Sequence, residues 1–260
     1  MPTTLFDYWG LLPTFALVLA RMGGVVLAAP VFGTAAIPRG IKVYFVVAMT
    51  LAVLPAVAPR VDAGLTLGDA LLGMVGELAI GVALGMGTNL ILAATQLTGL
   101  VIEQQAGLAI SQVLDPMTGS RASVLGEIYF IVAGLVFLSI GGDRVLVRTL
   151  LESLVRVPLM TFREHGAACD VLVNLLAVSF VLSVQLAAPA IIALLLTSAA
   201  LGFLARTVPQ LNVLSVGFSV KIIVAVVILV GTLPLASRAL EAAFADAFDT
   251  IAMLLGNGTP

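Results

Sequence analysis

Residues 171–204 read VLVNLLAVSFVLSVQLAAPAIIALLLTSAALGFL, a run that contains no Asp, Glu, Lys or Arg. A straight α-helix of this length would extend roughly 50 Å at about 1.5 Å per residue. The hydrocarbon core of a bilayer is only ~30 Å thick. The run also far exceeds the ~9–11 residues of a strand in a membrane barrel. It therefore predicts a helical membrane segment that is too long for one ordinary span.

Pro189 lies near the middle of this run. Proline lacks a backbone N–H, and its ring clashes with the preceding turn of a helix. The sequence therefore predicts a kink or a break at Pro189, with Gln185 one turn earlier, beside the backbone that a break would expose.

The composition of the whole chain supports a membrane protein. Of its 260 residues, 61% are hydrophobic and 10% are charged, against roughly 45–50% and about 25% in soluble domains. The mean hydropathy is +1.19. These values exclude a soluble enzyme, because too little polar surface is available to cover the core in water. We expect an all-α integral membrane protein.

Other apolar stretches have the length expected of membrane helices, and one of them is overlong. The sequence stays compatible with a single helix from about residue 67 to 113, with no proline before Pro116. Residues 142–170 form a charged segment, expected to be partly helical and broken at Pro158. The remaining apolar stretches span residues 11–30, 41–58, 124–141 and 213–236.

No motif for catalysis, cofactor binding or metal binding is visible. His165 and Cys169 are the only residues of their types, so most zinc sites, Ser–His pairs and CxxC motifs lack a second component. No basic run suggests a nucleic-acid surface. We expect neither an enzyme nor a nucleic-acid-binding protein.

Several ionisable residues interrupt the apolar stretches. Charges inside a bilayer are costly and usually face protein or water. For Arg206 and Lys221, snorkelling of the side chain to the membrane surface near a helix end explains the position about as well as a contact with protein or water does. Carboxylates have short stems, so we expect Glu77 and Glu103 to face a cavity or a partner subunit.

Glu103 also belongs to a pattern of polar residues, because Asn89, Gln96 and Glu103 are spaced seven apart on one helical face. Small residues lie nearby, among them Gly99 and the pair Gly81-xxx-Gly85. Such a face suits a close helix–helix contact or a water-lined passage. Packing within a single chain is the alternative, but the abundance of glycine favours packing against other chains.

Two connectors are candidates for function. The first follows the polar face directly and is positioned to close a passage if that face lines one; its residues include Ser111, Gln112, Asp115, Pro116 and Met117. A plain surface turn is the alternative, and physics alone favours it. The second connector contains Pro209 and Gln210 and predicts a tight hairpin between two apolar helices, with Asn212 capping the second one.

The second connector carries a family resemblance. The pattern Arg206-x-x-Pro209-Gln210-x-Asn212, followed by Gly217-Phe218 and Lys221-Ile222, resembles the signature of the FliR/SctT family of type III export proteins. Two weaker matches agree with it, one at residues 29–42 and one in the central segment at residues 99–116. These are Ala29-Pro30-Val31-Phe32-Gly33 with Ile37-Pro38 and Lys42, and Gly99-x-x-x-Glu103-Gln104-x-x-Gly107-Leu108 with Asp115-Pro116.

The resemblance implies a core subunit of the export gate in the bacterial inner membrane, at the base of a flagellum or an injectisome. It implies FliP-like and FliQ-like partners, FlhB-like and FlhA-like neighbours, and unfolded proteins in transit. It further implies bent helical hairpins, with a FliP-like part (residues 1–165) followed by a FliQ-like hairpin (166–260). By the resemblance, residues from about 107 to 122 correspond to a plug inside the closed pore, and Glu103, Gln104 and Gly107 are candidates for the pore or the plug.

Two other functions remain possible from the residues alone. A small secondary transporter or channel also uses broken helices and buried carboxylates, and it would act alone or as a homo-oligomer. A scaffold subunit without a pore would tolerate changes along the Asn89–Gln96–Glu103 face.

Overall fold

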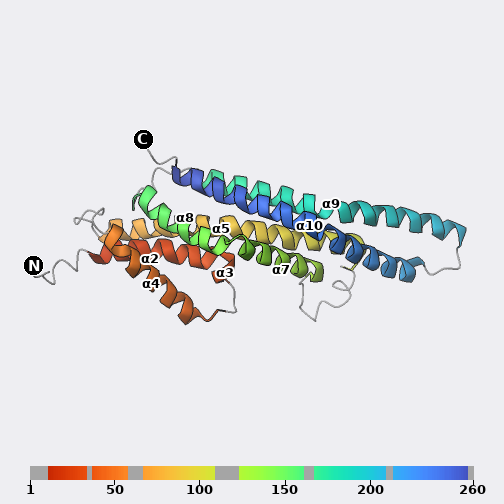
Figure 1. Cartoon of the computed structure of the whole chain (residues 1–260), viewed down its shortest axis with the longest axis horizontal. Coiled ribbons are helices and arrows are strands. Elements are labelled where there is room, and N and C mark those ends of the chain that lie inside the picture. Colours follow the sequence, from red (N-terminus) through yellow and green to blue (C-terminus); the bar gives the residue numbers. More distant parts are fainter. Residues whose placement is uncertain are drawn as a thin grey trace, which may run out of the picture. The chain divides into compact units, whose positions relative to one another are not determined.

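The computed structural model describes residues 11–33, 37–57, 67–108, 123–160, 167–208 and 213–256. Within these ranges the regular structure is entirely helical, as the composition predicted (Figure 1). The helices are α2 (Leu11–Ala28), α3 (Pro30–Gly33), α4 (Arg39–Val57), α5 (Leu67–Ala106), α7 (Val124–Ser139), α8 (Gly142–Arg156), α9 (Ala167–Thr207) and α10 (Val213–Gly256).

Five of the described helices are long and apolar enough to cross a membrane, namely α2, α4, α5, α9 and α10. The pair α7 and α8 passes the same test together as one broken span, which raises the number to six. The prediction of an all-α integral membrane protein is therefore confirmed, and the chain is a multi-pass membrane protein.

Three helices are much longer than the ~20 residues that a bilayer needs. α5 has 40 residues, α9 has 41 and α10 has 44. α9 is one helix through Pro189, so it is not broken at this proline, and the kink that was predicted as the other possibility stays a prediction. Leu186 and Ala190 are buried on either side of it. We attribute the continuity to this packing, because proline removes only one backbone donor and neighbouring groups in a membrane protein can accommodate the loss.

The chain divides into two compact units. Unit 1 comprises residues 1–90, 141–176 and 244–260, and unit 2 comprises 91–140 and 177–243. The long helices α5, α9 and α10 each contribute residues to both units. These units differ from the predicted FliP-like and FliQ-like parts, and the division near residue 165 stays a prediction.

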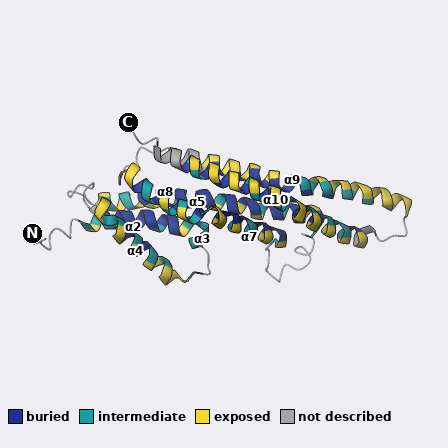
Figure 2. Cartoon of the chain, in the orientation of Figure 1, coloured by how far each residue is buried: buried dark blue, intermediate teal, exposed yellow. Residues whose placement is uncertain are grey.

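In unit 1, α2 packs against several other helices. α2 contacts α4, α3 and α8 (Figure 1). Half of the apolar stretch of α2 is buried, against 17% of that of α4 (Figure 2). Leu17, Val18 and Met22 of α2 are almost completely enclosed. α4 therefore leaves most of its apolar surface available to lipid or to another protein.

Unit 2 is built from the end of α5, from α7, and from the adjoining parts of α9 and α10. The largest enclosed side chains of its described residues are Tyr129 and Phe137 of α7, followed by Ile91, Ile102, Leu194 and Leu240. Gly217 of α10 is buried, and a Cβ at this position would lie 3.4 Å from Leu201 of α9. These two helices are therefore in contact within unit 2.

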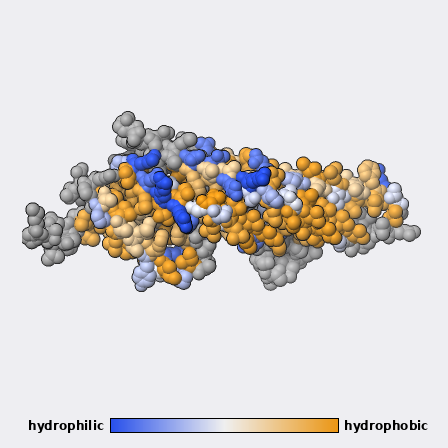
Figure 3. All heavy atoms as spheres, viewed as in Figure 1, coloured by the Kyte–Doolittle hydropathy of each residue, from blue (hydrophilic) through white to orange (hydrophobic). Residues whose placement is uncertain are grey.

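Apolar side chains also cover much of the outer surface (Figure 3). On α9 and α10 the exposed ones include Phe180, Leu196, Phe203, Val227 and Val230. Hydrophilic residues gather in bands instead, and one band lies over α8 (Figure 3). Exposed apolar area of this extent marks a surface that contacts membrane or protein.

Candidate functional site

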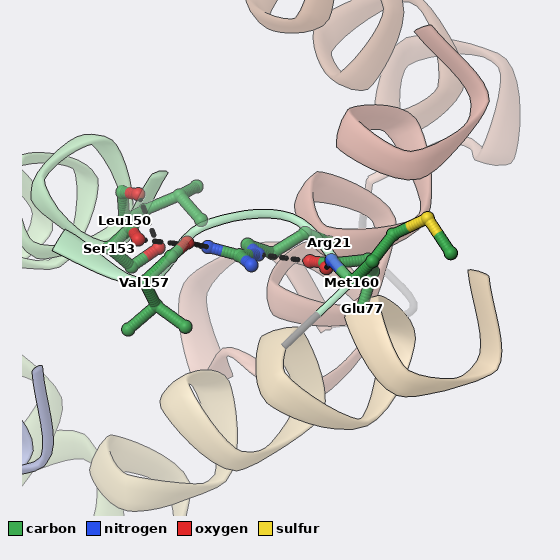
Figure 4. Close-up of polar contacts among 6 residues, drawn as sticks. All are labelled: Arg21, Glu77, Leu150, Ser153, Val157 and Met160. Carbon is green, nitrogen blue, oxygen red and sulfur yellow. Dashed lines mark hydrogen bonds and ion pairs between the residues drawn. The ribbon is translucent and has the colours of Figure 1, made fainter. Parts of the chain in front are cut away.

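The most enclosed charges of the described chain form an ion pair between α2 and α5. The Arg21 Nε lies 2.5 Å from the Glu77 Oε2, and both side chains have 0% exposed surface (Figure 4). Ionised groups of this kind are stable inside a protein only when they are paired and hydrogen-bonded. Glu77 was expected to face a cavity or a partner subunit, whereas the structure pairs it with Arg21 of the same chain.

Backbone groups bind two further atoms of the ion pair, whereas the Arg21 Nη2 has no hydrogen-bond partner among the described residues. The Arg21 Nη1 donates to the carbonyl oxygens of Ser153 at 2.9 Å and of Val157 at 3.1 Å. Both oxygens belong to the end of α8, where a helix carries partial negative charge that favours a cation. On the other side, the Met160 N–H donates to the Glu77 Oε1 at 2.9 Å. The pair therefore ties α2, α5 and the end of α8 together (Figure 4).

Met160 adopts an unusual backbone conformation to make this bond. Its φ is +73°, a region that costs a non-glycine residue roughly 1–2 kcal/mol. The charge-assisted hydrogen bond to Glu77 offsets that cost, since bonds to ionised groups contribute about 1.5–3 kcal/mol. Neither the role of Met160 nor that of the α8 carbonyls could be read from the sequence, because these are backbone contacts between distant segments.

Glycines allow α2 and α5 to approach closely enough to enclose the pair. A Cβ at Gly81, one turn after Glu77, would overlap the carbonyl oxygen of Arg21. A Cβ at Gly85 would lie 2.8 Å from the Val25 oxygen. The predicted close contact at Gly81-xxx-Gly85 is thus present, but its partner is α2 of the same chain. This is the alternative of internal packing, not the favoured packing against other chains.

A second buried carboxylate lies in unit 2. Glu103, near the end of α5, is 4% exposed, and its Oε1 accepts a hydrogen bond of 2.8 Å from the Leu125 N–H. Leu125 lies in the first turn of α7, where backbone N–H groups lack partners within the helix. The Ser123 Oγ accepts from the Gly126 N–H at 2.8 Å. The expectation that Glu103 faces a pore or a partner subunit is therefore corrected, because its carboxylate binds α7.

The residues of the predicted polar face differ in how far they are buried. Asn89 and Gln96 are exposed while Glu103 is buried, and Gln104 is exposed as well. Besides Glu77 and Glu103, the buried polar residues of α5 are Thr88, Thr95 and Thr98, which donate to carbonyls of their own helix. Thr98 also donates to the Ser183 oxygen of α9 at 3.2 Å.

The residues of the two predicted connectors are only partly covered. Arg206 is exposed and Lys221 is half-buried, in keeping with positions near helix ends, and Gly107 ends α5 with a φ of +85°. The others lie outside the described residues, and they are Ser111, Gln112, Asp115, Pro116, Met117, Pro209, Gln210 and Asn212.

These features define a class: an all-helical multi-pass membrane protein with overlong helices, large exposed apolar faces and buried ionic contacts between helices. Residues 12–247 match the family described as bacterial export proteins, family 1. The chain belongs to this family, which includes the FliR and SctT proteins, and it is a component of the type III export apparatus.

Named relatives extend over most of the chain. It is 30% identical over 225 residues to the flagellar biosynthetic protein FliR of Bacillus subtilis (strain 168), covering 85% of this chain and 86% of that one. It is 31% identical over 235 residues to FliR of Pectobacterium carotovorum, covering 90% of each. The surface presentation of antigens protein SpaR of Shigella flexneri is 29% identical over 156 residues, 60% of each chain.

Proposed function

We propose that this chain is a core subunit of the flagellar type III export gate in the bacterial inner membrane. The observation that carries the proposal is its similarity to flagellar FliR proteins over 85–90% of its length. SpaR, from a surface-presentation system, aligns over only 60%, which favours the flagellar system. In this role the chain co-assembles with FliP-like and FliQ-like subunits, next to FlhB-like and FlhA-like ones, and helps to pass unfolded proteins.

Its exposed surface supports co-assembly. α4 leaves most of its apolar residues uncovered, including Tyr44 and Leu51, and α10 exposes Val227 and Val230. Neighbouring hydrophobic helices would cover these faces. The contact between Gly217 and Leu201 supports the further proposal that α9 and α10 act as a FliQ-like hairpin within residues 166–260, after a FliP-like part in residues 1–165.

We also propose that residues 107–122 form the plug of the resting gate. The support for this proposal is the resemblance, which implies a plug in this part of the chain, together with the described helices α5 and α7 on either side of it. Glu103, Gln104 and Gly107 then lie at the entrance to the plug, and Ser111, Gln112, Asp115, Pro116 and Met117 lie within it.

Loss of this chain is expected to abolish flagellar protein export. In a bacterium that encodes it, deletion of its gene should remove the secreted flagellar proteins from the culture medium, because the gate would lack one of its core subunits. Immunoblots of medium and cells would measure this. Re-expression of the parent chain, or of a conservative Val227→Ile variant, should restore secretion. Normal secretion without the chain would refute the proposed function.

A further inference from the structure

The end of α5 packs directly against the start of α7. Gly99 and Glu103 are one helical turn apart, so they share a face. A Cβ at Gly99 would overlap the backbone of Leu125 and Gly126, so the two helices meet here backbone against backbone. Glu103 then reaches the Leu125 N–H at 2.8 Å. Gly99 therefore allows the two helices to approach closely, and the Glu103 carboxylate forms the hydrogen bond between them.

Glu103 also takes part in ending its own helix. The Leu108 N–H donates to the Glu103 backbone oxygen at 3.1 Å, and the Gly107 N–H donates to the Gln104 oxygen at 3.2 Å. With Gly107 at a φ of +85°, this is the Schellman arrangement that closes many helices. A Cβ at Gly107 would also lie 2.5 Å from the ring of Phe218, so glycine is required here for two reasons.

The start of α7 depends on groups outside its own backbone. Its first amides are bound by two side chains, Ser123 Oγ on Gly126 and Glu103 Oε1 on Leu125. A carboxylate is favoured at this end by the partial positive charge of the helix terminus. Ser123 is a neighbour in sequence, whereas Glu103 lies 22 residues away on another helix. Of these two side chains, that of Glu103 is therefore the one that connects the two helix ends.

We propose that Glu103 is a positioning residue that latches the end of α5 to the start of α7, with Gly99 and Gly107 as the glycines that make the latch possible. The latch fixes the end of α5 next to the start of α7, and residues 109–122 connect these two helix ends. Bringing the ends of a connector together costs conformational entropy, and the hydrogen bond of Glu103 offsets that cost. Its link to gating rests on the proposed function, whereas the latch itself does not.

Amide hydrogen exchange tests the latch on the full chain in mild detergent, alone and co-purified with FliP-like and FliQ-like subunits. In Glu103→Leu, the amides of Leu125 and Gly126 should exchange roughly fivefold to thirtyfold faster, which is the scale of losing a helix cap. Glu103→Gln keeps an acceptor oxygen of the same reach and should lie between Leu and the parent. Gln105→Leu, an exposed neighbour, is the matched control and should leave the exchange unchanged.

The outcomes separate the latch from the gate. Faster exchange in Glu103→Leu, with partial rescue by Gln, supports the latch. An ion leak through the intact assembly of this variant would also support the role of the latch in gating, whereas faster exchange without a leak would keep the latch and contradict that role. Unchanged exchange overturns the latch. If Glu103→Leu does not accumulate, Glu103→Asp replaces it, because its shorter side chain should lose the bond that Gln keeps; equal exchange in Asp, Gln and the parent also overturns the latch.

Discussion

Replacing Glu77 with leucine is expected to lower the free energy of unfolding of this chain by about 3–5 kcal/mol, the usual effect of removing one partner of a buried ion pair. The substitution leaves the Arg21 guanidinium enclosed without its carboxylate, and the Met160 N–H without its acceptor. In mild detergent we expect a lower denaturation midpoint and less folded protein on size-exclusion chromatography.

Two further variants separate the charge from the geometry. Arg21→Leu combined with Glu77→Leu should recover part of the loss, because no unpaired charge remains buried. Exchanging the residues, as Arg21→Glu with Glu77→Arg, should not recover it. The swap restores opposite charges, but it turns a carboxylate toward the Ser153 and Val157 carbonyl oxygens that now accept from Arg21.

An exposed ion pair of the same chain provides the control. Arg148 and Glu152 of α8 are joined at 2.8 Å, but the Arg148 side chain is 81% exposed. Arg148→Leu should therefore change stability little, because exposed pairs contribute only about 0–1 kcal/mol. Equal stability of Glu77→Leu and Arg148→Leu would contradict the role given to the buried pair.

Deleting residues 112–120 is expected to make cells leaky to ions and small solutes once the assembly has formed. If these residues close the resting passage, their removal leaves an open pore whose conductance greatly exceeds that of the parent gate. Dye uptake or ion flux in cells that co-express the FliP-like and FliQ-like subunits would measure this.

Two controls make that result specific. The deleted chain expressed without the FliP-like and FliQ-like subunits should cause no leak, because the passage requires the assembly. Replacing residues 112–120 with Gly and Ser at the same length tests whether side chains or chain length close the gate. A deletion assembly of normal mass that stays as tight as the parent would refute the plug.

The helices were predictable because the length and apolarity of a segment are local properties. The stretches at 11–30, 41–58 and 124–141 correspond to α2, α4 and α7, and the overlong run from residue 67 is α5. The helix is not broken at Pro189 because local propensity, which predicts a break, is outweighed by the packing around the proline. The apolar surroundings of Glu77 and Glu103 also indicated that these carboxylates avoid lipid, although the expectation was a cavity or a partner subunit.

The partners of these carboxylates were not foreseeable. Arg21 lies 56 residues from Glu77, and only the approach of α2 and α5 at their glycines brings the two together. An arginine and a glutamate in different apolar helices could have suggested the pair by their opposite charges. The Leu125 amide and the α8 carbonyls gave no signal at all, since any residue supplies such groups. The packing partner of these glycines was also predicted wrongly, because a sequence shows that the side chains of a helical face are small but not which helix covers that face.

Co-assembly is the central claim, and the native mass of the complex tests it most directly. The tagged chain would be co-expressed with FliP-like and FliQ-like subunits, extracted in mild detergent and weighed by native mass spectrometry. The account predicts a large, defined hetero-complex that contains this chain and both partners. A monomer or homodimer whose mass does not change with those subunits would contradict it and would favour a transporter or channel that acts without them.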